Sequence, residues 1–92
     1  LGVTQYTIGG IGMFYKIQSV IPEEDFILQV QFTDGVEKRY DMKPLLKKVP
    51  EFLDLKTIPG LYKQVKVDTG GYGISWNDEI DLAGNELREN GI

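Results

Sequence analysis

The sequence predicts an α+β fold in which an antiparallel β-sheet, a three-stranded meander plus a C-terminal hairpin, is combined with short helices. Two observations predict this fold. Apolar and polar residues alternate with the period of a strand through residues 26–32 and 36–42. Glycine-containing turns at 33–35 and 69–71 separate strand-like segments. With 92 residues, of which 41% are hydrophobic, the chain can bury one core.

The N-terminal residues differ in composition from the rest. Residues 1–12 contain four glycines and no charged side chain, and the composition changes at Met13. We therefore expect a leader or tag-like, loosely ordered arm over residues 1–12 and a single α+β domain over residues 13–92. The arm lacks the basic region of a signal peptide.

Three strands are expected in the first half of the chain. The first covers residues 15–21 and gives way at Pro22 to a turn, because proline fixes φ. The second covers 26–32, and its apolar face must be buried. Asp34 and Gly35 form a tight hairpin signal, since this pair readily adopts positive φ, and the third strand continues to Met42.

Short helices and a second set of strands are expected in the other half. A helix covers 44–48, with Pro44 tolerated at its first position and Pro50 at its end. Residues 51–62 form a packed connector of single helical turns, and a fourth strand covers 63–68.

The only tryptophan lies in the next expected strand. Ile74 and Trp76 lie on its buried face, opposite Gly73 and Ser75. A turn at 77–79 precedes Ile80 and Leu82, which resume the alternation. A helix over 85–91 then ends at Gly91.

Composition excludes several kinds of chemistry. The chain has neither cysteine nor histidine, so disulfides, thiolate nucleophiles and zinc fingers are ruled out. Ser19 and Ser75 have no histidine to activate them and begin no Ser-x-x-Lys pattern. We expect no enzymatic activity and no cofactor. No apolar run is long enough to span a bilayer, and we expect a cytoplasmic protein that binds no membrane.

Two loop motifs invite specific functions. Gly70, Gly71 and Gly73 resemble a phosphate-binding loop, but they lead into a strand rather than a helix N-terminus, which favours a hairpin. Asp78, Glu79 and Asp81 are carboxylates that could hold a divalent metal or exchange protons. No EF-hand spacing is present, so turn and capping roles are favoured.

Charge is distributed unevenly along the chain, which has a net charge of -4. Residues 36–66 carry eight lysine or arginine residues against four acidic residues, and residues 67–92 carry one arginine against six acidic residues. Mutual neutralisation on a solvated surface is the favoured interpretation. The alternative is a basic face offered to an acidic partner or a polyanion.

Several short motifs together indicate a family. They are Phe32-Thr33-Asp34-Gly35, Arg39-Tyr40-Asp41, Pro44-Leu45-Leu46, Val65-Lys66-Val67-Asp68, Gly73-Ile74-Ser75-Trp76-Asn77-Asp78 and Ile80-Asp81-Leu82. From about residue 15 to 91 the chain resembles the small bacterial family catalogued as domain of unknown function 2442. The resemblance implies an α+β fold with an antiparallel sheet and carries over no catalytic residue. Some members resemble partners of small proteins in toxin–antitoxin-type gene pairs, and others are fused to a helix-turn-helix domain.

We therefore expect a non-enzymatic protein-interaction domain, with an antitoxin-like partner of a small basic protein as its specific form. The expected binding surface combines an open sheet edge with four acidic residues, Asp78, Glu79, Glu86 and Glu89. The alternative is a nucleic-acid-associated module that uses the basic segment 36–66, namely Lys38, Arg39, Lys47, Lys48 and Lys63. A third hypothesis is a metal-dependent enzyme that uses Asp78 and Asp81. An exposed edge strand would also permit a homodimer.

Overall fold

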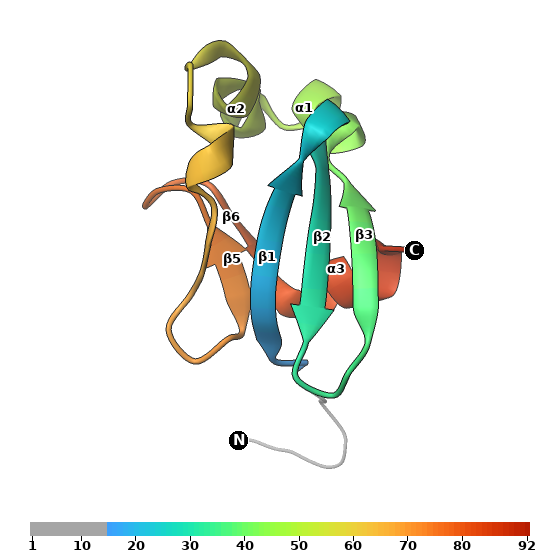
Figure 1. Cartoon of the computed structure of the whole chain (residues 1–92). Helices are drawn as coiled ribbons and strands as arrows, with labels where there is room; N and C mark the ends of the chain where they lie inside the picture. The colour runs from blue at the N-terminus through green and yellow to red at the C-terminus, as the bar shows by residue number, and fades with distance from the viewer. Residues whose placement is uncertain (1–14) are drawn as a thin grey trace.

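The computed structural model describes residues 15–92 (Figure 1). The chain forms two three-stranded antiparallel sheets, in the orders β1-β2-β3 and β4-β5-β6, together with short helices. This confirms the α+β class, the meander and the C-terminal hairpin. The arm expected over residues 1–12 lies outside the described residues.

The first sheet is the meander of β1 (Ile17–Glu23), β2 (Ile27–Phe32) and β3 (Glu37–Asp41). Alternate residues of β2 are buried, as the sequence pattern predicts. The fully buried ones are Leu28, Val30 and Phe32. At the β2–β3 turn Gly35 has a φ of +92°, which confirms the predicted hairpin.

The first strand does not end at Pro22, as expected, but continues to Glu23. Pro22 pairs with Leu28 of β2. Proline is tolerated here because β1 is an edge strand, whose outer side needs no backbone donor. The connection to β2 is instead the 3₁₀ turn η1 (Glu24–Phe26), so Phe26 belongs to the turn and not to the second strand.

The helix predicted over 44–48 forms as α1 (Lys43–Lys48). Residues 51–62 contain single helical turns, as predicted, in η2 (Pro50–Leu53), α2 (Asp54–Thr57) and the start of η3 (Tyr62–Gln64). We call the segment from α1 to η3 the connector. The turns lie together at one end of the meander (Figure 1). They are anchored by three buried side chains, Phe52, Leu55 and Leu61.

The second sheet contains β4 (Lys66–Val67), β5 (Gly73–Ser75) and β6 (Asp81–Ala83). β4 is shorter than the expected strand over 63–68, because η3 occupies the beginning of that segment. β5 is buried on both faces, whereas one buried face was expected. Ser75 donates a hydrogen bond to Asp68 (Oγ to Oδ1, 2.6 Å), which satisfies its buried hydroxyl.

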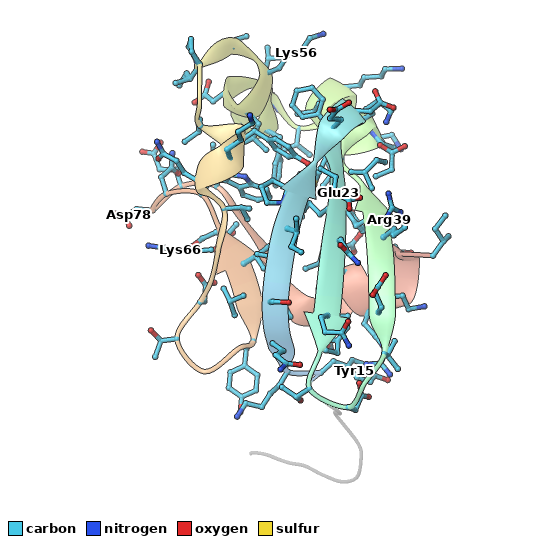
Figure 2. All side chains as sticks on the ribbon, in the orientation of Figure 1. Tyr15, Glu23, Arg39, Lys56, Lys66 and Asp78 are labelled. Carbon is cyan, nitrogen blue, oxygen red and sulfur yellow. The ribbon has the colours of Figure 1, made fainter. Side chains whose placement is uncertain are left out.

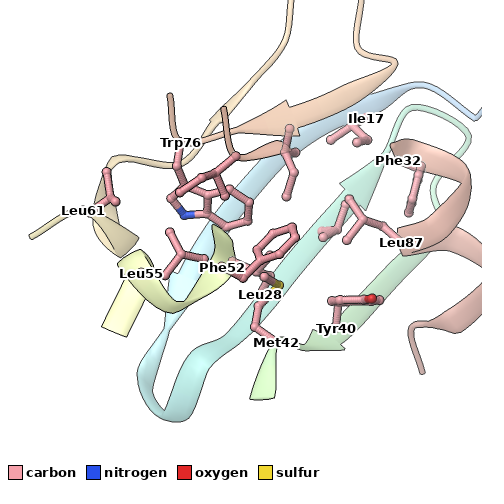
Figure 3. Close-up of a cluster of buried hydrophobic side chains, with 13 residues drawn as sticks. Ile17, Leu28, Phe32, Tyr40, Met42, Phe52, Leu55, Leu61, Trp76 and Leu87 are labelled. Carbon is pink, nitrogen blue, oxygen red and sulfur yellow. The ribbon is translucent and has the colours of Figure 1, made fainter. Parts of the chain in front are cut away.

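The core lies between the first sheet and a layer formed by β5, the connector and α3 (Gly84–Asn90), as Figures 1 and 3 show. Trp76, directly after β5, joins β5 to the connector. Its ring packs edge-on against Phe52, and its Nε1 donates to the carbonyl of Tyr62 at 3.0 Å. Trp76 is therefore the core anchor that the sequence predicts.

The C-terminal helix α3 crosses behind the meander and buries Leu87 completely (Figure 1). It begins one residue earlier than expected and ends before Gly91. Gly91 has a φ of -77°, so it is not a left-handed cap. A Cβ at this position would lie 2.6 Å from the carbonyl oxygen of Leu87 and 3.0 Å from the Cβ of Lys38, so close packing explains the glycine. None of the helices within residues 15–92 has the length and apolar character needed to cross a membrane.

Candidate interaction surfaces

The turn between β5 and β6 has a fixed shape. Asn77 Oδ1 accepts hydrogen bonds from the backbone N–H groups of Glu79 and Ile80, both at 2.9 Å. The Trp76 N–H donates to the carbonyl of Ile80 at 3.0 Å and closes the turn. Asp78 and Glu79 are exposed at its tip. The sequence prediction of a turn at 77–79 is confirmed, and Asn77 supplies the reason.

This turn carries negative charge that the surrounding structure does not neutralise. Within residues 15–92 the ion pairs use the carboxylates of Glu23, Asp25, Asp34 and Asp41. Asp78, Glu79 and the nearby Asp81 make none there. We call these three residues the acidic turn. Among the described residues no three acidic side chains gather closely enough to hold a metal ion.

The other two predicted acidic residues lie on α3. Glu86 accepts a hydrogen bond from the Tyr40 hydroxyl at 2.8 Å, and it is thereby tied to β3. Burial of the phenol, followed by the hydrogen bond to Glu86 and its charge, raises the pKa of Tyr40. Glu89 is exposed. The acidic turn and α3 lie at opposite ends of β6, so the structure brings Asp78 and Glu79 together but places Glu86 and Glu89 elsewhere (Figure 1).

The five predicted polyanion-binding residues are not gathered on one face. Lys38 and Arg39 are consecutive in β3, so their side chains point to opposite faces of the sheet. The Arg39 guanidinium lies 2.6 Å from the carboxylate of Glu23, which offsets its charge. The remaining three are exposed lysines on the connector, Lys47 and Lys48 on α1 and Lys63 on η3.

An open sheet edge was predicted, but both outer strands of the meander, β1 and β3, are partly covered. The backbone of Ile92 exchanges two hydrogen bonds with Arg39 of β3, at 2.9 and 3.0 Å. On the other side, the N–H of Ile17 in β1 donates to the carbonyl of Gly71 at 2.7 Å. Pairing through a sheet edge, including pairing in a homodimer, stays a prediction.

Two hollows flank the η1 turn, and the side chains of Asp25 and Phe26 border both. The first, of about 460 Å³, is lined by Pro22, Glu23, Glu24, Asp25, Phe26, Tyr62 and Lys63. The second, of about 410 Å³, lies between η1 and the helices α1 and α2. We call it the lysine hollow, and it is lined by Asp25, Phe26, Lys43, Leu46, Lys47, Leu53 and Lys56.

Sequence reasoning placed Lys43, Lys47 and Lys56 in a basic segment but did not predict that they converge. A partial signal was present, because residues four apart on a helix share a face, and Lys43 and Lys47 have that spacing on α1. Lys56 joins them only through the fold. Figure 2 shows Lys56 at the connector end of the molecule, away from Asp78 and Lys66.

Tyr62 fixes the η1 turn from the other side. Its hydroxyl lies within hydrogen-bonding distance of the carbonyl oxygens of Glu23 and Ile27, at 3.1 and 2.9 Å. Burial and the charge of Glu23 raise the pKa of Tyr62 to about 12. Its ring packs edge-on against Phe26 with 4.9 Å between centroids. The phenol is therefore a structural support of the turn.

No curated protein and no solved structure matches the chain. The profile of the family described as "Protein of unknown function (DUF2442)" matches residues 17–92. The match begins at the first residue of β1 and includes both sheets, the connector and α3. It confirms the family resemblance seen in the sequence motifs. The chain therefore belongs to the DUF2442 family.

Proposed function

We propose that this chain is a non-enzymatic protein-interaction domain that binds a small basic protein through its acidic turn. The observation that carries the proposal is the turn itself, where Asp78, Glu79 and Asp81 make no ion pair within the described residues. Unneutralised carboxylates on a surface attract a basic partner and orient its approach. An antitoxin-like pairing with that partner is the specific form we propose.

The rigidity of the turn supports the proposal. Its backbone is held by the two hydrogen bonds to Asn77 Oδ1 and by the bond from Trp76 to Ile80. Trp76 is itself fixed in the core. A preorganised loop loses little conformational entropy on binding, so more of the contact free energy contributes to affinity. Glu86 and Glu89 lie on α3, apart from this turn, and Glu86 is bound to Tyr40.

The proposal is tested by affinity capture with the tagged chain from a lysate of its source organism, with and without nuclease. We expect one small basic protein to be recovered under both conditions. The double variant D78K/E79K should lose it, because the turn then repels the partner. The control variant E37K/E51K changes the net charge by the same amount at two exposed carboxylates that make no ion pair within residues 15–92.

Two results would contradict the proposal. Equal recovery by D78K/E79K and by E37K/E51K would mean that the turn is not the binding surface. Recovery that disappears with nuclease would instead favour the nucleic-acid-associated module, with Lys47, Lys48 and Lys63 as its exposed cations.

A further inference from the structure

The lysine hollow combines an apolar floor with a basic rim. Phe26 and Leu46 are half-buried in the floor, and Leu53 is 45% exposed. Lys43, Lys47 and Lys56 surround this floor, and Asp25 is the only acidic residue in the lining. The hollow therefore offers buried apolar contact and positive charge at the same place.

Two of the three lysines make no ion pair within the described residues. Lys43 is held by Asp25, whose carbonyl oxygen and carboxylate lie 2.8 and 3.1 Å from its Nζ, and by Asp41 at 3.0 Å. Lys47 and Lys56 make no ion pair in the part of the chain that the structure describes. A ligand with carboxylates can therefore pair with them without breaking an existing contact.

The wall formed by η1 has a constrained backbone. Asp25 and Phe26 have φ values of 62° and 57°, in the left-handed region that residues with a side chain seldom adopt. The turn keeps this shape because Lys43 binds Asp25, the Met42 N–H donates to the Phe26 carbonyl, and Tyr62 supports the Phe26 ring. Such backbone strain concentrates at ligand-binding and switch regions. This backbone conformation places Phe26 between the two hollows.

From this arrangement we infer that the lysine hollow is a docking site for an acidic peptide segment of a protein partner, one that carries at least one large apolar side chain. The apolar residue lies on Leu46 and Leu53, and flanking carboxylates pair with Lys47 and Lys56. Charge complementarity with the lysines and the apolar side chains of Leu46 and Leu53 favour this occupant. Proteins that bind single-stranded nucleic acid commonly stack its bases on exposed aromatic rings, and the one ring in the lining, Phe26, already packs against Tyr62. The site goes beyond the proposed function, since it is a second surface of opposite charge.

The experiment uses the full chain and a labelled amphipathic peptide of glutamate and leucine, read by fluorescence anisotropy and by amide chemical shifts. We expect binding with shifts centred on residues 46–56. Peptides with glutamine in place of glutamate, or alanine in place of leucine, should bind more weakly. The variant K47E/K56E should lower the affinity about tenfold, since two charge pairs become repulsive. L53S should lower it about threefold.

The control is K16E/K66E, which makes the same charge change at two exposed lysines outside the lysine hollow. We expect its affinity to stay within about twofold of the original protein. Equal weakening by K16E/K66E and K47E/K56E, or shifts centred outside residues 46–56, would overturn the proposal. Preferential binding of a labelled single-stranded DNA, lost in K47E/K56E, would also overturn it and assign the hollow to nucleic acid. Circular dichroism of each variant confirms that it folds.

Discussion

At the scale of single residues, Gly71 is required for two separate reasons. Its φ is +82°, and a Cβ there would lie 2.9 Å from the carbonyl oxygen of Ile17. Gly60 has the same φ but open space around the position of a Cβ. We expect G60A to lower the free energy of unfolding by about 1 kcal/mol, from backbone strain alone. G71A should lower it by about 2–3 kcal/mol, because the joint between β1 and the second sheet must also shift.

Urea unfolding of the two variants checks this pair. Equal losses would show that the contact between Gly71 and Ile17 relaxes without cost. The Ile17 N–H donates to the Gly71 carbonyl. In G71A the amide shifts should therefore change at the start of β1, whereas in G60A the amide shifts there should stay the same.

Tyr62 makes the stability depend on alkaline pH. Its pKa in the folded protein is about 12, above the ordinary value of 10.0. The neutral phenol is thus favoured by folding, and its contribution to stability is complete below pH 10 and is lost as the pH rises toward 12. Y62F should be less stable than the original protein near neutral pH, because the hydrogen bond from the phenol to the backbone carbonyls that flank η1 is missing. The difference between the two should shrink between pH 10 and 12.

Urea midpoints of both proteins at a series of pH values measure this difference. The two proteins differ only at residue 62, so the contributions of all other groups cancel in this difference. A difference that stays constant from pH 9 to 12 would mean that Tyr62 titrates with an ordinary pKa.

At the scale of elements, α3 is fastened to the meander by Arg88. The guanidinium lies 4.1 Å from the ring centroid of Tyr15 and 5.0 Å from that of Phe32, and it pairs with Asp34. We expect R88K to lower the free energy of unfolding by about 0.5–1.5 kcal/mol, because lysine keeps the charge but loses planar stacking. Thermal unfolding measures it. A lysine variant as stable as the original would mean that charge alone fastens α3.

Sequence patterns predicted some of these elements correctly and others wrongly. The period of two in β2 and the Asp34-Gly35 pair predicted the meander, because both signals depend on residues close in sequence. The predicted end of the first strand at Pro22 was wrong, because a proline is tolerated in an edge strand and only the sheet order shows which strands are edges. The second face of β5 was missed for the same reason, since Ser75 is covered by Asp68 through the fold.

Of the two candidate sites, one could be predicted from local sequence and the other could not. The acidic turn was predictable, because Asn77, Asp78 and Glu79 form a local turn motif. The lysine hollow was not, since Asp25 and Lys56 belong to segments far apart in the sequence that meet only when η1 packs beside α1 and α2. The separation of Glu86 from the acidic turn likewise depends on its bond to Tyr40, which no local pattern reveals.

At the scale of the whole molecule, the ion pairs of the described residues lie apart from the two candidate binding surfaces. The ion pairs of the described residues involve the meander, its turns, α1 and α3, and they include Arg39 with Glu23 and Arg88 with Asp34. The expected mutual neutralisation thus holds there. The acidic turn and the free lysines of the hollow keep their charge, and Figure 2 shows Asp78 and Lys56 on different parts of the molecule.

This separation predicts that the two surfaces act independently. Sites that share no partner and lie well apart have additive effects on free energy. D78K/E79K should therefore weaken binding of the basic protein and leave the affinity for the acidic peptide within about twofold, since at about 0.15 M salt distant exposed charges are screened. K47E/K56E should do the reverse. Titration of each variant with each ligand at low and physiological salt measures both effects. If either variant weakened both ligands equally, net charge and not a defined surface would govern binding, and the assignment of separate sites would be wrong.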